Sequence, residues 1–255
     1  MNLHVGYTHG VGLVMVPVNE VAQGGQPNLI IKDLPPTSTA GAPKIIQPRI
    51  YFGTQTNDYV VVGAKTQEFD YPSSTGTGGD QLTTWTGTSG IKLDTPLSKL
   101  LFAARFGDLN LLISDQVTGS SQLLFNRSIQ DRVIALAPFL RLDKDPYLVV
   151  SSEGRLDYVQ DAFTTSANFP DASTYNPGSD SATNGLAGSP FNYIRNSVKV
   201  VMDAYDGTTT LYVSDTTDPI IKAWQGVFPS LFKPISDMPV DIRGDAANIG
   251  HLRYP

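Results

Sequence analysis

Short apolar runs alternate with segments rich in glycine, proline and small polar residues along most of the chain. In the first half, β-branched and aromatic residues predict strands over four such runs: residues 12–16, 28–31, 49–52 and 59–62. The first two flank Gly24-Gly25-Gln26-Pro27, a turn built on φ-permissive glycines, and so predict a hairpin over 10–34. Prolines make residues 34–48 an extended connector, because proline lacks the N–H that a helix interior needs.

The strongest helix signal lies in the middle of the chain. Thr95 is a capping residue, Pro96 suits the first helical position, and Gly107 supplies the stop. Between them, apolar residues recur at i, i+3, i+4 and i+7, which is the spacing of one face of an amphipathic helix: Leu97, Leu100, Leu101 and Ala104.

Two shorter helices are predicted further along the chain. Ser128 and Asp131 have the spacing of a capping box, which predicts a helix over 128–137, before Pro138. Near the C-terminal end, Pro219 marks the start of a short helix that runs to about Phe228.

The second half otherwise has the pattern of β structure. Four runs predict strands: residues 147–150, 155–159, 198–205 and 208–213. A Glu153-Gly154 turn joins the first two, and Asp206-Gly207 joins the last two, a dipeptide favoured where both turn residues take positive φ. We expect the two hairpins to share one antiparallel sheet.

Because strand runs and helix runs are segregated, the predicted fold class is α+β. Antiparallel hairpins or sheet are expected in both halves, with a central helical segment over about 95–137 and short C-terminal helices. A chain of 255 residues buries about three quarters of its unfolded surface, which is enough for one substantial core. We expect a single soluble domain over 1–255, and any subdivision to fall near residue 140.

Charge and cysteine content exclude several classes of function. The chain carries 18 Lys and Arg against 24 Asp and Glu, a net charge of −6, so no nucleic-acid partner is expected. No stretch approaches the roughly 20 apolar residues that span a bilayer, and the first residues lack a signal-peptide pattern. The chain has no cysteine, which excludes disulfides, thiol catalysis and cysteine-ligated metals.

Motifs for cofactors and metals are also absent from the sequence. There is no phosphate-binding Gly-Lys-Ser/Thr loop, no dinucleotide glycine fingerprint and no nucleophile elbow. The three histidines do not have zinc-ligand spacing: His4, His9 and His251. Residues 180–185 are only partly similar to a calcium loop, because the third and twelfth loop positions hold Ala182 and Phe191. We therefore expect no cofactor and no metal.

Seven polar residues are candidates for a binding site or a structural network: His9, Asp58, Arg105, Asp108, Asn110, Arg195 and Asp206. His9 could act as a general base because an imidazole titrates near neutrality, although a structural role is the preferred interpretation. Arg105 could bind an anion while Asp108 and Asn110 orient a ligand, but a network at the helix end is again preferred. Arg195 precedes a strand, where it either caps a sheet edge or lines a cleft.

A further group of charges lies near the middle of the chain. Three arginines and three aspartates are interspersed there: Arg127, Asp131, Arg132, Arg141, Asp143 and Asp145. The arginines could form an anion site, but the aspartates are available to neutralise them. Ion pairs at the surface are therefore the preferred interpretation.

Blocks of sequence that run in order over nearly the whole chain carry a family resemblance: 7–10, 17–20, 48–53, 68–72, 105–112, 137–140, 192–198, 203–207, 231–234 and 251–255. On these blocks the chain resembles uncharacterised protein family 0182, whose members look like large bacterial membrane proteins. In that family, several N-terminal transmembrane helices precede an extensive extracytoplasmic region. The resemblance implies that this chain is a segment of that region, with its own transmembrane part and envelope components as partners. It implies no established activity, cofactor or catalytic residue.

Three functions remain open. The leading hypothesis is a non-catalytic extracytoplasmic module that packs against, senses for or assembles with its own membrane part. The alternatives are a cell-envelope hydrolase or transferase that uses carboxylates with His9 or Arg105, and the extracytoplasmic part of a transport-related membrane protein. The module hypothesis predicts that the seven candidates lie scattered or bond the backbone, whereas an enzyme needs them around one cleft.

Overall fold

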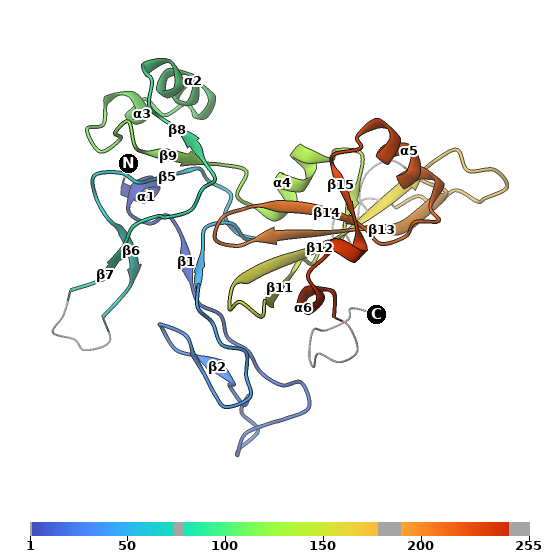
Figure 1. The fold of residues 1–255 in the computed structure, drawn as a ribbon, viewed down its shortest axis with the longest axis horizontal. Coiled ribbons are helices and arrows are strands. Elements are labelled where there is room, and N and C mark those ends of the chain that lie inside the picture. Colours follow the sequence, from blue (N-terminus) through green and yellow to red (C-terminus); the bar gives the residue numbers. More distant parts are fainter. Residues whose placement is uncertain (1, 74–78, 178–189, 245–255) are drawn as a thin grey trace. The chain divides into compact units, whose positions relative to one another are not determined.

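A computed structural model describes residues 2–73, 79–177 and 190–244 (Figure 1). The chain falls into two compact units. Unit 1 comprises Met1–Arg127 together with Ala204–Gly207, and unit 2 comprises Ser128–Asp203 together with Thr208–Pro255. The expectation of a single domain, with any subdivision near residue 140, stays a prediction. The partly calcium-like residues 180–185 and His251 lie outside the described residues.

Unit 1 combines short strands with three helices: α1 (Asn2–Val5), β1 (Gly10–Val11), β2 (Ile31–Lys32), β3 (Thr37–Ser38), β4 (Arg49–Ile50), β5 (Val60–Val62), β6 (Glu68–Tyr71), β7 (Gln81–Thr83), β8 (Ile91–Lys92), α2 (Pro96–Phe106), α3 (Asn110–Ile113) and β9 (Gln122–Leu124). Strands β1 and β4, β2 and β3, and β6 and β7 form antiparallel pairs, while β5, β9 and β8 form a three-stranded sheet. The predicted hairpin over 10–34 is largely irregular and is held by isolated bridges, such as Met15 with Ile31. Figure 1 shows this segment extending away from the rest of the unit.

Helix α2 begins and ends where its capping residues predicted. The Thr95 side chain accepts from the Ser98 N–H in a capping box, and Gly107 closes the helix in the left-handed conformation. Its inward face is formed by Ala103, which is buried, and by Phe102 and Phe106, which pack against the same core. The predicted apolar stripe lies on the other side and is exposed. The helix is therefore apolar on two faces, of which the core covers one.

Unit 2 is built on one six-stranded sheet with helices around it: α4 (Ile129–Leu136), β10 (Arg141–Leu142), β11 (Tyr147–Val150), β12 (Leu156–Ser166), β13 (Tyr193–Asp203), β14 (Thr209–Val213), α5 (Pro219–Val227), β15 (Phe232–Pro234), η2 (Ile235–Asp237) and α6 (Val240–Arg243). The strand order is β10-β12-β13-β14-β15, and β11 also pairs with β12. Both predicted hairpins are thus in one sheet, as expected. All its pairs are antiparallel except β14 with β15, which is parallel.

The observed mixture of helices and antiparallel strands confirms the α+β class. One local prediction is wrong: Ser128 precedes α4, but its side chain makes no capping hydrogen bond. The sequence spacing of Ser128 and Asp131 is that of a capping box, but Asp stands where that motif has Glu or Gln. Among the described residues, no helix is long and apolar enough to cross a bilayer.

Strand β12 of unit 2 buries a carboxyl group. Asp157 is 8% exposed and lies opposite Asp203 in the β12–β13 register. Burial, and then the charge of Asp203, raise the pKa of Asp157 to about 7, and Arg155 only partly opposes this. Because the folded state favours the protonated form, the cost of ionisation is absent below the ordinary pKa of about 4. The cost grows as pH rises toward 7 and is complete above it.

Asp157→Asn is therefore expected to stabilise the protein by about 2–4 kcal/mol at about pH 8 and to leave it nearly unchanged at about pH 4. Urea unfolding at the two pH values measures this difference. The exposed Asp145 provides the control, since Asp145→Asn should change stability little at either pH. An equal effect of Asp157→Asn at both values would contradict the raised pKa.

Candidate functional site

Unit 1 contains a group of hydrogen-bonded residues, most of them buried, that come from segments far apart in the sequence. We call this group the buried polar network: Thr8, His9, Arg49, Tyr51, Glu68, Asp70, Trp85 and Arg127. Its two carboxylates lie in β6, where Glu68 and Asp70 are two residues apart and so share a face of the strand. This face of β6 is buried. The other face carries Phe69 and Tyr71, which are only half-buried.

Glu68 is the central acceptor of the network and is only 2% exposed. One carboxylate oxygen accepts from the hydroxyls of Thr8 and Tyr51, the latter at 2.7 Å. The other accepts from the Trp85 backbone N–H at 3.0 Å. Burial opposes ionisation of Glu68, but interactions with His9, Thr8, Tyr51 and the Trp85 N–H outweigh it and lower the pKa. Glu68 is therefore a buried carboxylate at neutral pH.

Arg127 supplies a buried positive charge and is 5% exposed. Its guanidinium donates to three main-chain carbonyls: Nε to Tyr51 at 2.7 Å, Nη1 to Asp58 at 3.0 Å and Nη2 to Thr8 at 2.6 Å. Burial lowers the pKa of Arg127 to about 10, against the opposing charges of Asp58 and Glu68. The side chain is still charged at neutral pH, and it fastens three loops to one point.

Thr8 and Tyr51 join the two buried charges. Each donates its hydroxyl to Glu68 and accepts from Arg127 at its main-chain carbonyl. The carboxylate and the guanidinium therefore stabilise one another through two intervening residues without touching. In such a chain of hydrogen bonds each bond polarises the next. Breaking the chain therefore costs more free energy than breaking one isolated hydrogen bond.

Asp70 forms the second ionic part of the network. Arg49 donates to both of its oxygens, from Nε at 3.0 Å and from Nη2 at 2.6 Å. His9 Nε2 lies 3.2 Å from the same carboxylate, and the His9 ring stacks on Tyr51 at 4.5 Å between centroids. The bidentate geometry is the strong form of an arginine–carboxylate pair.

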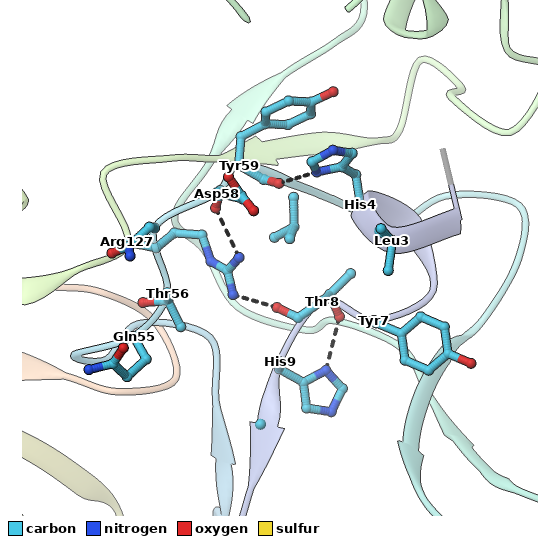
Figure 2. A pocket seen from close by; sticks show the side chains of 13 residues that line it. Leu3, His4, Tyr7, Thr8, His9, Gln55, Thr56, Asp58, Tyr59 and Arg127 are labelled. Carbon is cyan, nitrogen blue, oxygen red and sulfur yellow. Dashed lines mark hydrogen bonds between the residues drawn. The ribbon is translucent and has the colours of Figure 1, made fainter.

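An open hollow of about 440 Å³ borders the network (Figure 2). It is lined by residues 3–4, 7–10 and 55–60 and by Arg127. Figure 2 shows the Arg127 guanidinium reaching from one wall toward the carbonyls of Asp58 and Thr8, with the His9 ring on another part of the lining. Its volume is in the range of small-molecule sites.

Of the seven candidate residues, His9 and Asp58 line this hollow. Asp108 and Asn110 lie together elsewhere in unit 1: the Asp108 carboxylate accepts from the Tyr59 hydroxyl at 2.5 Å and from both nitrogens of Asn110. The Tyr59 bond is the main cause of a lowered pKa at Asp108. Arg105 is exposed and lies over the rings of Phe106 and Phe125, at 5.8 and 5.4 Å.

The last two candidates are also held by the protein itself. Asp206 accepts from the backbone N–H groups of Thr88 and Ser89, at 2.9 and 3.0 Å, and these bonds lower its pKa despite burial. Arg195, in unit 2, pairs with Asp215 at 2.8 Å. The seven residues thus occupy several separate places, and His9 and Asp58 share the hollow described above.

Sequence reasoning missed most of the buried polar network. The alternation in β6 was visible, but period-two spacing does not say which face is buried, and a buried acidic face is unusual. The expected surface pairing of Arg127 with nearby aspartates is wrong. Its partners are main-chain carbonyls 69 to 119 residues away, which leave no local signal.

Within the described residues, no group of three or more histidine or acidic side chains is arranged to hold a metal ion. The fold and site define an α+β protein whose main polar feature is a buried network beside an open hollow.

The profile of the Uncharacterised protein family (UPF0182) matches residues 1–255, and the chain belongs to this family. It is 44% identical to the UPF0182 protein of Clostridium acetobutylicum over 254 residues, and 44% identical to that of Bradyrhizobium diazoefficiens over 256. A relative from Geobacter sulfurreducens is 43% identical over 249 residues, which is 98% of this chain. The chain spans about a quarter of the length of these curated relatives. No solved structure matches it significantly.

Proposed function

We propose that this chain is a non-catalytic docking module, held against another part of a longer polypeptide by an apolar helical surface. That surface, the α2–α3 face, consists of leucines and an isoleucine that are between 52% and 78% exposed: Leu97, Leu100, Leu101, Leu109 and Ile113. A surface helix normally turns its apolar side to the core and its polar side to water. Contiguous exposed apolar side chains are typical of an interaction surface.

The two helices that carry these side chains pack on one another and are joined by a short connection at Gly107. Figure 1 shows both helices next to β8 and β9, on one side of unit 1. The core does not need these leucines, since Ala103, Phe102 and Phe106 already cover it from the other face of α2. Their apolar area is thus free to be buried against a partner.

The length of the relatives supports a partner in the same polypeptide. About three quarters of each curated relative lies outside the aligned segment, so a large additional surface is tethered to this module. Tethering gives an intramolecular partner a high effective concentration, so a surface of moderate size suffices. We place the module on the extracytoplasmic face of a bacterial membrane, with the polypeptide's own membrane part as its first partner. This placement is supported by the family resemblance.

The polar candidates favour a module over an enzyme. Asp108, Asp206 and Arg195 are each engaged by the protein's own hydrogen-bonding groups. His9, the one candidate base, has a fully buried side chain between two carboxylates. A general base must reach a proton on the substrate, which this position does not allow.

Cysteine labelling tests the docking surface, because the chain has no cysteine of its own. Leu101→Cys is expected to react readily with a maleimide in the 255-residue chain. In the full-length polypeptide that contains it, labelling should be at least about tenfold slower, equivalent to about 1.4 kcal/mol of protection.

Lys65→Cys is the matched control on the same unit, because Lys65 is exposed and lies outside the α2–α3 face. It should be labelled equally fast in both proteins. Equal labelling of Leu101→Cys in both would overturn the proposal. So would protection that appears only with lipid vesicles or only on dimerisation.

A further inference from the structure

In the buried polar network, a neutral His9 and the Thr8 hydroxyl carry too few protons for the hydrogen bonds that these two residues make. His9 faces an oxygen from each ring nitrogen: Nδ1 lies 2.9 Å from the Thr8 hydroxyl and Nε2 lies 3.2 Å from Asp70 Oδ1. The Thr8 hydroxyl also contacts Glu68 Oε2. Three hydrogen bonds therefore need three protons. A neutral imidazole and one hydroxyl supply two.

The protonation of the surrounding groups decides where the third proton lies. Asp70 accepts from Arg49 at both of its oxygens, which is the bidentate geometry of an arginine–carboxylate pair. Glu68 accepts from Tyr51 and from the Trp85 N–H, and its pKa is lowered, so it is ionised as well. The single proton of Thr8 is then used on Glu68. His9 must donate from both nitrogens.

We propose that His9 is held as an imidazolium in the folded protein, and that Thr8, His9, Glu68 and Asp70 form a buried proton-binding site. The side chains of His9, Glu68 and Asp70 are 0%, 2% and 4% exposed. With the proton bound, His9 and Arg49 balance the charges of Glu68 and Asp70. Without it, the same buried group carries one uncompensated negative charge.

The other groups around His9 do not remove this imbalance. Tyr51 stacks on the ring but stays neutral, since burial and Glu68 raise the pKa of its phenol. Arg127 is also positive, but its hydrogen bonds go to main-chain carbonyls and to neither carboxylate, and Asp58 acts on it more strongly than Glu68 does. A proton on His9 therefore brings the summed charge of His9, Arg49, Glu68 and Asp70 to zero.

The site joins two segments of unit 1, so the bound proton helps to hold these segments together. We call this effect the latch. Thr8 and His9 lie on the N-terminal segment, and Glu68 and Asp70 lie on β6. The two segments are also joined by one main-chain bond, from the Phe69 N–H to the Gly6 carbonyl at 2.8 Å. When His9 loses its proton, Nδ1 or Nε2 turns a lone pair toward an oxygen, and this contact becomes repulsive.

Nitrogen-15 NMR of the histidine side chains tests the assignment directly. At about pH 8, where an unperturbed imidazole is neutral, His9 is expected to carry protons on both ring nitrogens. His4 is an internal control, since its Nδ1 faces the Tyr59 carbonyl at 2.7 Å and one proton satisfies that bond. A neutral His9 ring would overturn the proposal, and the wild-type protein alone gives this answer.

A second measurement tests the latch. Exchange of the Phe69 amide hydrogen should accelerate by at least about tenfold beyond its intrinsic pH dependence once His9 deprotonates. In Asp70→Asn, which keeps the side-chain shape, His9 should lose its second proton at lower pH than in the wild type. If the titration of His9 were the same in Asp70→Asn and wild type, the carboxylate would have no part in holding the proton, and the proposed site would be wrong.

Discussion

Arg127→Leu is expected to lower the free energy of unfolding of unit 1 by about 3–5 kcal/mol. The change leaves the carbonyls of Thr8, Tyr51 and Asp58 without the donor that they share, and the first two belong to buried residues. It also removes a positive charge that is linked to Glu68 through Thr8 and Tyr51. Each buried acceptor that loses its partner costs about 1–3 kcal/mol, and the loss of this nearby charge adds to it.

The fluorescence of Trp85 can report the unfolding of unit 1, because the Trp85 backbone N–H donates to Glu68 in the same network. The other tryptophan, Trp224, belongs to unit 2, so urea unfolding in a Trp224→Phe background follows unit 1 by fluorescence. Arg105→Leu is the matched control, since Arg105 is exposed, and should cost less than about 1 kcal/mol. A similar cost for both arginines would show that the carbonyls do not depend on Arg127.

Gly207→Ala should be nearly as damaging, with an expected loss of about 2–5 kcal/mol. Gly207 has a φ of +69°, which an L-residue adopts only at a cost of about 1–2 kcal/mol. An added Cβ would also lie 2.6 Å from the ring of Phe52, which is fully buried and has little room to move. Strain and overpacking therefore act together at this position.

Gly24→Ala separates these two causes. Gly24 has a φ of +84°, but nothing lies within 4 Å of an added Cβ, so only the backbone cost of about 1–2 kcal/mol applies. The same urea experiment compares the two variants. If Gly207→Ala cost no more than Gly24→Ala, the close packing of Phe52 against the turn would be refuted.

The elements that sequence predicted well are those whose signals are local. Thr95, Pro96 and Gly107 mark the ends of α2 because capping involves only neighbouring residues. The Asp206-Gly207 turn likewise identified the hairpin of β13 and β14. Such signals act over a few residues and survive in any tertiary setting.

What the sequence did not reveal depends on partners far along the chain. The leucine spacing in α2 was visible, but only the structure shows that Ala103 and Phe106 face the core while Leu100 and Leu101 face outward. The candidate site shows the same limit, since His9 was recognised and its partner Glu68, 59 residues away, was not. Periodicity describes the faces of an element and does not say what will cover them.

The division of the chain between the two units has a consequence for its synthesis. The backbone N–H groups of Tyr51 and Phe52 donate to the carbonyl of Ala204, at 2.8 and 2.9 Å, and Ala204–Gly207 belong to unit 1. When Arg127 leaves the ribosome, unit 1 therefore still lacks four of its residues. They follow only after residues 128–203, roughly 4–15 s later at ordinary rates of translation. The N-terminal unit is completed only when most of the unit that follows it has been made, so it cannot finish folding before that point in synthesis.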